Sequence, residues 1–214
     1  MKHVLSFEKV SIRLGRAPIL RDLTLTVSPG DVIGLSGPNG AGKSTLLRAA
    51  ATLIRLATGT GTVLGVDMAT AGPDVRARIG MLAHDPAVFG ELTLLENLEF
   101  VARITGQPEE RALEILEAVG LRAAAYRRAD CSSHGMARRV DIARLVLTEP
   151  KLVLLDEAAA GLDEAAVSLI ATAIERTTIA GGAVILVTHD ATYLDTVTNR
   201  HWRLVDGTVH EDAP

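Results

Sequence analysis

The sequence predicts an α/β fold with a mostly parallel sheet, an N-terminal antiparallel β subdomain and an inserted helical subdomain. Three short apolar runs, 32–35, 152–155 and 183–187, lack polar alternation, as buried parallel strands do when helices cover both faces of a sheet. Apolar residues recur at helical spacing between these runs and alternate with polar residues before the first. Hydrophobic residues make up 48% of the 214 positions, which excludes wholesale disorder and suffices for a sizeable core.

The first part of the chain predicts the antiparallel sheet. Residues 3–10 alternate loosely between apolar and polar, and residues 23–27 alternate cleanly before a Pro-Gly turn. Residues 60–67 place three strand-favouring residues between glycines. Alternation with a period of two is typical of strands that bury one face, so we expect a small antiparallel sheet beside the parallel one.

Helical periodicity dominates from about 92 to 128 and interrupts the alternation of strands and helices. We therefore expect a helical subdomain inserted into the α/β core. The sequence predicts one domain over 1–214, in which about 1–91 and 150–214 form the core and about 92–149 form the helical subdomain.

Composition and charge exclude several kinds of function. Aromatic residues make up only 3%, with one Trp, which leaves few surfaces on which single-stranded nucleic acid could stack. The formal net charge is −4, from 22 Lys and Arg against 26 Asp and Glu, so no nucleic-acid partner is expected. The single Cys131 cannot form an intrachain disulfide, which fits a reducing cytosol, and we expect it to be a packing residue. We find no signal peptide and no apolar run of ~18 residues, and expect any membrane role to come through a partner.

The motif Gly37-Pro-Asn-Gly-Ala-Gly-Lys-Ser-Thr45 fits the pattern G-x-x-x-x-G-K-[ST] and lies between a predicted strand and a helix expected over 44–56. Its glycines let several backbone N–H groups face one anion, and the helix directs its positive end to the same point. Lys43 then reaches the β- and γ-phosphates, and the Ser44 hydroxyl coordinates Mg²⁺. An ordinary glycine-rich turn is the alternative, but the flanking strand and helix favour a P-loop NTPase core. We expect ATP to bind at Gly37, Pro38, Asn39, Gly40, Ala41, Gly42, Lys43, Ser44 and Thr45.

The apolar run over 152–155 ends in two carboxylates, Asp156 and Glu157. Asp156 at the strand end can hold Mg²⁺ through its water shell. Glu157 then stands where a general base is needed for attack of water on the γ-phosphate. A strand ending in a solvated acidic loop is the alternative. The Asn-Lys-x-Asp motif that reads guanine is absent, which excludes a GTPase.

A third segment, Ser132-Ser-His-Gly-Met136, precedes a helical run. Small residues at a helix start expose backbone N–H groups, so this is a second potential anion site. Arg138, Arg139 and Arg144 either add positive charge to that site or line a solvated helix face. By composition alone the segment is a helix N-cap, a position for which Ser133 is well suited.

Two histidines follow predicted strands. His189 in Val187-Thr-His-Asp190 can hydrogen-bond the γ-phosphate or the attacking water, and is otherwise a structural residue. His84 in Ala83-His-Asp-Pro86 can contact the metal or its water, and is otherwise an ordinary loop residue. The six histidines and single cysteine show no zinc-binding spacing, so we expect no zinc.

Taken in order, these segments resemble the ATP-binding subunits of ABC transporters over nearly the whole chain. Residues 37–45 match the Walker A motif, and residues 152–157 match Walker B. Residues 132–136 are similar to the family signature Leu-Ser-Gly-Gly-Gln, residues 160–163 to the D-loop, and His189 to the switch histidine. Walker A alone occurs in many families, whereas this ordered set is specific.

The resemblance implies ATP hydrolysis by a head-to-tail pair of such subunits. Each ATP would lie between the Walker A of one chain and the signature of the other, where Ser133 and Gly135 would touch its γ-phosphate. Asp163 would contact the opposite Walker A at the dimer interface. The pair, which we expect to be a homodimer, would drive integral membrane permease subunits from the cytoplasmic face of the cell membrane.

The resemblance also assigns the remaining roles. The cofactors would be ATP and Mg²⁺. The catalytic residues would be Glu157, His189 and Lys43. The metal ligands would be Ser44, Asp156 and His84.

Within the family, Gly80-Met-Leu-Ala-His-Asp-Pro86, with Glu91-Leu-Thr93 and Glu96-Asn-Leu98, is similar to the haem exporter ATPase of cytochrome c maturation. Those subunits are similarly short and carry His where most relatives have Gln. ATPases of drug or polysaccharide exporters share much of this pattern and are the alternative, since substrate choice lies in the membrane subunits.

Besides His84, four positions depart from the common family pattern. His134 and Met136 replace Gly and Gln of the signature, and Ala158 replaces the Pro after the catalytic Glu. Leu14 stands about where relatives place an aromatic that stacks on adenine. These changes motivate another alternative, a nucleotide-binding module that dimerises with little turnover. A soluble relative acting on DNA or ribosomes would carry two cassettes or a long coiled coil, and this chain has neither.

Overall fold

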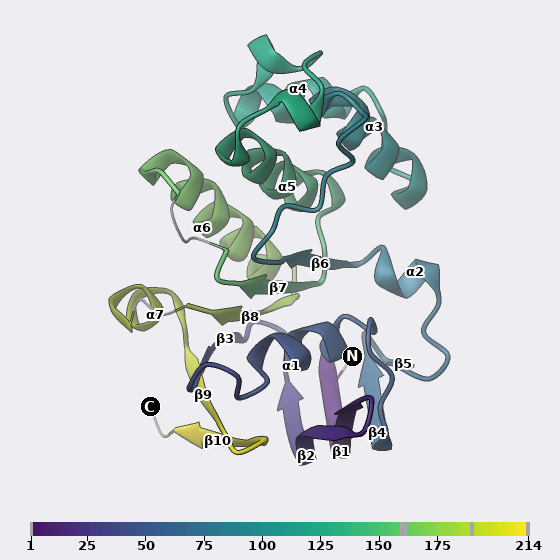
Figure 1. The fold of residues 1–214 in the computed structure, drawn as a ribbon, viewed down its shortest axis with the longest axis vertical. Coiled ribbons are helices and arrows are strands. Elements are labelled where there is room, and N and C mark those ends of the chain that lie inside the picture. Colours follow the sequence, from purple (N-terminus) through teal and green to yellow (C-terminus); the bar gives the residue numbers. More distant parts are fainter. Residues whose placement is uncertain (1, 159–161, 189–190, 213–214) are drawn as a thin grey trace.

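The computed structural model describes residues 2–158, 162–188 and 191–212, which form two sheets and a helical layer (Figure 1). The larger sheet has the strand order β10-β9-β3-β8-β7-β6. Its centre consists of the three predicted apolar runs, which pair in parallel and are buried over nearly every residue. The prediction of a mostly parallel sheet is confirmed. The strands are β3 (Val32–Ser36), β6 (Ile79–Leu82), β7 (Leu152–Asp156), β8 (Ala183–Val187), β9 (Arg200–Val205) and the antiparallel edge strand β10 (Thr208–Asp212).

The smaller sheet is antiparallel, as predicted, with the order β2-β1-β4-β5. Its strands are β1 (Leu5–Leu14), β2 (Ala17–Val27), β4 (Thr58–Val63) and β5 (Val66–Asp67). The first two are longer than the alternation indicates. Register shifts interrupt their pairing, and Lys9 and Asp22 have φ of 50° and 46°. Such bulges reverse which side chains face inward, so the period of two is lost beyond them.

The helix after β3 is shorter than predicted: α1 spans Lys43–Ala50 rather than 44–56. Thr52 has φ of 61°, its N–H donates to Ala49 O at 2.8 Å, and the N–H of Leu53 donates to Arg48 O at 2.9 Å. This pair of bonds around a left-handed residue is the Schellman ending of a helix. The prediction that the helix continues to residue 56 is wrong, because apolar residues keep the helical spacing in the loop that follows the end of α1.

Helices cover both faces of the larger sheet. On one face, Leu46 and Leu47 of α1 share a core with Phe7 of β1 and with Leu154 and Ile185 of the central strands. On the other face, α6 (Glu164–Ile179) packs its apolar side against β7 and β8. The short helices α2 (Pro73–Arg76) and α7 (Ala191–Val197) complete the α/β part.

The inserted helices have a core of their own. They are α3 (Leu94–Thr105), α4 (Arg111–Ala118) and α5 (His134–Thr148), with 3-10 turns at Arg122–Ala124 and Ala129–Cys131. Leu94, Leu98, Leu116, Val140 and Leu147 are buried among one another. In Figure 1 this layer lies beyond β6 and β7, on the far side from α1. The expectation of an inserted helical subdomain is confirmed, and its boundaries at 92 and 149 stay a prediction.

Cys131 is exposed, so the expectation that it packs is wrong. It ends a 3-10 turn, after which the chain continues extended through Ser132. A side-chain hydrogen bond with Asp130, and then the negative charge of that carboxylate, raise the pKa of the Cys131 thiol. Among the described residues, no helix combines the length and the apolar character needed to span a bilayer.

Candidate functional site

The predicted site residues follow four neighbouring parallel strands. The motif beginning at Gly37 follows β3, Asp156 ends β7 just before Glu157, and His84 follows β6. His189 follows β8 and lies outside the described residues. Because β3, β8, β7 and β6 are consecutive in the sheet and parallel, their carboxyl ends meet at one edge. That edge is where open α/β sheets bind their ligands.

The loop before α1 has a backbone that only glycine adopts easily. Gly37, Gly40 and Gly42 have φ of 144°, 78° and 105°. A Cβ on Gly37 would lie 2.3 Å from Leu204 O, and a Cβ on Gly42 would lie 2.9 Å from a side-chain carbon of Ile19. Two of the glycines are therefore required by close approach as well as by conformation. The loop is held tightly against β9 and β2.

Lys43 and the start of α1 form the positive end of this cradle. Lys43 is buried, and its Nζ donates to Gly37 O at 2.7 Å and Pro38 O at 3.0 Å. The helix begins after Gly42 with no side-chain cap and no acidic residue in its first turn, which contains Ser44. The first N–H groups of such a helix need an acceptor, and an anion supplies it. The residues present fit a nucleotide phosphate.

Gly37→Ala is expected to lower ATP affinity at least about tenfold and to destabilise the fold by about 2 kcal/mol, because its Cβ overlaps a backbone oxygen. Gly40→Ala is the matched control, since a Cβ at Gly40 has nothing within 4 Å and only its positive φ is strained. Nucleotide titration and thermal unfolding of both variants check this. Equal losses in the two variants would show that close approach to β9 is unimportant.

The acidic pair lies two strands away from the cradle. Asp156 is 7% exposed and pairs with Val187 of β8. Glu157 has φ of 52°, and its N–H donates to Val187 O at 2.9 Å. A left-handed glutamate is uncommon and turns the chain sharply at the strand end.

Mg²⁺ prefers oxygen ligands and usually combines one or two protein groups with nucleotide phosphates. Ser44 and Asp156 offer one hydroxyl and one buried carboxylate at the same sheet edge. No cluster of three or more His, Cys, Asp or Glu side chains in the described part of the chain is suited to hold a metal ion. These two oxygen donors therefore fit an ion that takes its remaining ligands from a bound phosphate.

His84 is exposed, and its main chain is bound by the inserted helices. Arg138 of α5 donates through Nη1 to Ala83 O at 2.7 Å and through Nη2 to His84 O. Arg138 and the nearby Asp141 are only 3% and 1% exposed, so the alternative that this part of α5 is a solvated face is wrong. Burial lowers the pKa of Arg138 and raises that of Asp141, and their opposite charges counteract both shifts. Sequence reasoning missed Asp141, whose spacing three residues from Arg138 and Arg144 was the available signal.

Ser133 caps α5, as the composition predicts: its Oγ accepts the N–H of Met136 at 3.2 Å. Gly135 in the first turn is exposed. The structure does not bring these two residues to the P-loop of the same chain. Among the described residues, α5 packs on α3, α4, α6 and β6, whereas α1 packs on β7 (Figure 1).

Asp163 caps α6 by accepting the N–H of Ala166 at 2.9 Å, and it also pairs with Arg139. The bond from Ala166 and then the bond from Arg139 lower the pKa of Asp163. Its carboxylate is ionised at neutral pH and its side chain is 59% exposed. It is accessible to a second chain, while the neighbouring positions 159–161 lie outside the described residues.

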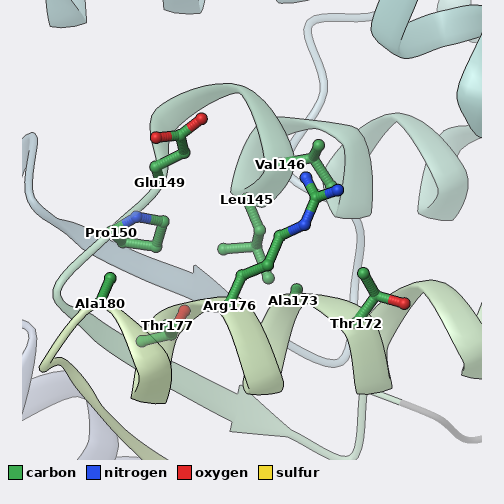
Figure 2. Close-up of a pocket in the computed structure, with 9 residues that line it drawn as sticks. All are labelled: Leu145, Val146, Glu149, Pro150, Thr172, Ala173, Arg176, Thr177 and Ala180. Atoms are coloured by element: carbon green, nitrogen blue, oxygen red, sulfur yellow. The ribbon is translucent and has the colours of Figure 1, made fainter.

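The surface has two hollows that bear on these residues. A mostly apolar pocket of about 220 Å³ lies between α5 and α6 (Figure 2), and none of the predicted site residues lines it. Its lining consists of Leu145, Val146, Glu149, Pro150, Thr172, Ala173, Arg176, Thr177 and Ala180. A more open hollow of about 550 Å³ is lined by Gly37 and Pro38 together with Arg203. The second borders the start of the phosphate loop, but Lys43 and Ser44 are not among its lining residues.

Comparison with known proteins agrees with this geometry. The family model described as ABC transporter matches residues 20–160. The cytochrome c biogenesis ATP-binding export protein CcmA 2 of Cupriavidus metallidurans is 36% identical over 87% of this chain and 89% of its own length. The daunorubicin resistance ATP-binding protein DrrA2 of Streptomyces coeruleorubidus is 38% identical over 85% of this chain, which spans only 57% of that protein. A solved ATP-binding cassette, a dimer in a post-hydrolysis state with ADP and phosphate bound, superposes with a TM-score of 0.86 at 25% identity over 97% of both chains.

Proposed function

We infer the function of this chain from the premise that it belongs to the ABC transporter family, as an ATP-binding subunit that hydrolyses ATP. Two copies are proposed to pair head to tail, so that each ATP lies between the P-loop of one copy and Ser133 and Gly135 of the other. Support comes from the exposed cap of α5 and from its separation from the P-loop of the same chain. Asp163, ionised and exposed, is proposed to contact the opposite P-loop.

The proposed chemistry uses residues at the carboxyl edge of the sheet. Lys43 and the N–H groups of the loop bind the β- and γ-phosphates. Glu157 takes a proton from the attacking water, and His189 orients that water or the γ-phosphate. Ser44, Asp156 and His84 would hold Mg²⁺, which would supply positive charge against the phosphates. The observation that carries the proposal is the parallel arrangement of β3, β8 and β7, which places the cradle and the acidic pair on one edge.

Phosphate release by the purified pair with its membrane partner tests this activity. Turnover that rises when the permease is present supports a transport motor. Nucleotide-dependent dimerisation without phosphate release would instead support the binding module that Ala158 and the altered signature suggested. Recovery of the chain with ribosomes rather than with a membrane protein would overturn the transporter assignment.

Ser133→Asp is expected to abolish ATP-driven dimerisation while α5 stays capped. Aspartate caps helices as well as serine does, but its charge would repel the γ-phosphate on the partner. Thr93→Asp is the matched control, because Thr93 caps α3 of the same subdomain and is not in the proposed site. Light scattering with ATP and thermal unfolding separate the effects. If Ser133→Asp dimerises normally, Ser133 is a helix cap and nothing more.

Haem export for cytochrome c maturation is the proposed transport function. It is supported by 36% identity to the relative from Cupriavidus metallidurans over 87% of this chain and 89% of that protein. Drug export is the second candidate, because the daunorubicin resistance protein is 38% identical. The chain would act at the cytoplasmic face of the cell membrane through a permease. Deletion of the gene should remove haem-bearing c-type cytochromes, whereas intact cytochromes with raised drug sensitivity would favour the second candidate.

A further inference from the structure

Three charged side chains on one face of α5 bind the chain that follows β6. Arg138 donates to the carbonyl oxygens of Ala83 and His84, and Arg144 donates to Ala87 O at 2.7 Å. Asp141 lies between the two arginines, 2.6 Å from Arg144 Nη1 and 3.5 Å from Arg138 Nη1. It also accepts a backbone hydrogen bond from Ala87. Four backbone groups of residues 83–87 are thus held by α5.

This cluster, Arg138, Asp141 and Arg144, is buried enough to fix its geometry. The side chains of Arg138 and Asp141 are 4% and 1% exposed, and that of Arg144 is 27% exposed. A buried guanidinium needs acceptors in fixed places, and its planar fork matches two consecutive carbonyl groups. If the loop left α5, the charge of Arg138 would become exposed to solvent or would stay buried without its acceptors.

The same loop is fixed to the helical layer further along. Asn97 of α3 accepts the N–H of Phe89 at 2.7 Å and donates to Phe89 O at 3.1 Å. At its other end, β6 is held in the large sheet by pairing with β7. Residues 83–89 thus follow a strand of the α/β core directly and are themselves hydrogen-bonded to the inserted helices.

We propose that Arg138, Asp141 and Arg144 are positioning residues that fix the main chain at His84 to α5, so that His84 and Ser133 move as one unit. This rests on the proposed roles of His84 and Ser133 in the nucleotide site. Because α5 runs without interruption from His134 to Thr148, a displacement of residues 83–87 is passed to the helix end at Ser133. Nucleotide in the P-loop of one chain then biases the surface that this chain offers to its partner's nucleotide.

Kinetics of three variants test the proposal in the full chain. Arg138→Gln and Asp141→Asn are expected to lower kcat about tenfold or more with KM for ATP within about twofold, because the loop is displaced while the P-loop is untouched. Arg144→Gln keeps the Arg138–Asp141 pair and should lower kcat less. Arg138→Lys keeps the charge and should restore part of the rate. The control Arg122→Gln removes an exposed pair with Glu117 in the same subdomain and should change neither value.

Hydrogen exchange supplies a readout that a general loss of stability would not produce. With a non-hydrolysable ATP analogue, wild-type protein should gain protection over 83–88 and over 133–137 together. Arg138→Gln, which loses the bonds to Ala83 O and His84 O, should keep the change over 83–88 and lose most of the change over 133–137. Protection that still changes together at both segments in Arg138→Gln, or unchanged kcat in the folded variant, overturns the proposal. Hydrogen exchange is measured without ATP hydrolysis. A wild-type protein that does not hydrolyse ATP would therefore overturn the proposed function, while the exchange result would still decide whether residues 83–88 and 133–137 are coupled.

Discussion

Lys43→Ala is expected to weaken ATP binding about a hundredfold, which corresponds to about 2.7 kcal/mol, and to abolish hydrolysis. Lys43 is the buried cation of the cradle, and its Nζ lies 2.7 and 3.0 Å from the oxygens of Gly37 and Pro38. Alanine removes the charge that would meet the β- and γ-phosphates, and it leaves two loop carbonyls without their donor. Isothermal titration with ATP and with ADP measures the loss.

Lys151→Ala is the matched control for this variant. Lys151 also donates from Nζ to a backbone carbonyl, that of Ala180 at 2.7 Å, but it lies at the amino end of β7. Its removal should leave nucleotide binding unchanged. If Lys43→Ala retains and cleaves ATP as the native chain does, the P-loop is not the nucleotide site, and the proposed roles of Ser44 and Glu157 lose their basis.

The parts of the fold that sequence predicted well are those decided by local chemistry. The central strands were evident because helices bury both of their faces and leave no polar positions. The cradle was evident because the glycine conformations and the lysine lie within nine consecutive residues. The end of α1 and the full length of β1 were missed, because a left-handed Thr52 and the bulge near Lys9 leave no clear mark in apolar periodicity.

The residues that hold the His84 loop could not be recognised from composition. Arg138 and Asp141 have the character of a solvated helix face, and they become buried because a segment about 55 positions earlier packs over them. The prediction for Cys131 is wrong in the opposite sense, because a residue type that is usually buried lies exposed at the end of a 3-10 turn. The first error arises because long-range packing overrides local preference.

Glu157→Gln is expected to reduce kcat for ATP hydrolysis by about a hundredfold to ten-thousandfold while leaving ATP affinity within about threefold. Glutamine preserves the size of the side chain and the N–H bond to Val187 O at 2.9 Å, so the turn after β7 is kept. It cannot accept the proton of the attacking water. Single-turnover phosphate release together with ATP titration separates the chemical step from binding.

Trapping of the dimer makes this variant informative about the whole cycle. If hydrolysis is what releases the closed pair, Glu157→Gln should accumulate as an ATP-bound dimer, because the ligand that favours the closed state is no longer consumed. Glu164→Gln is the control, because Glu164 lies exposed in the first turn of α6. This variant should hydrolyse ATP at the native rate. If Glu157→Gln hydrolyses ATP at the native rate, Glu157 is not the general base, and another residue at the same edge of the sheet must have that role. Slow turnover without a trapped dimer would instead separate hydrolysis from dimer release.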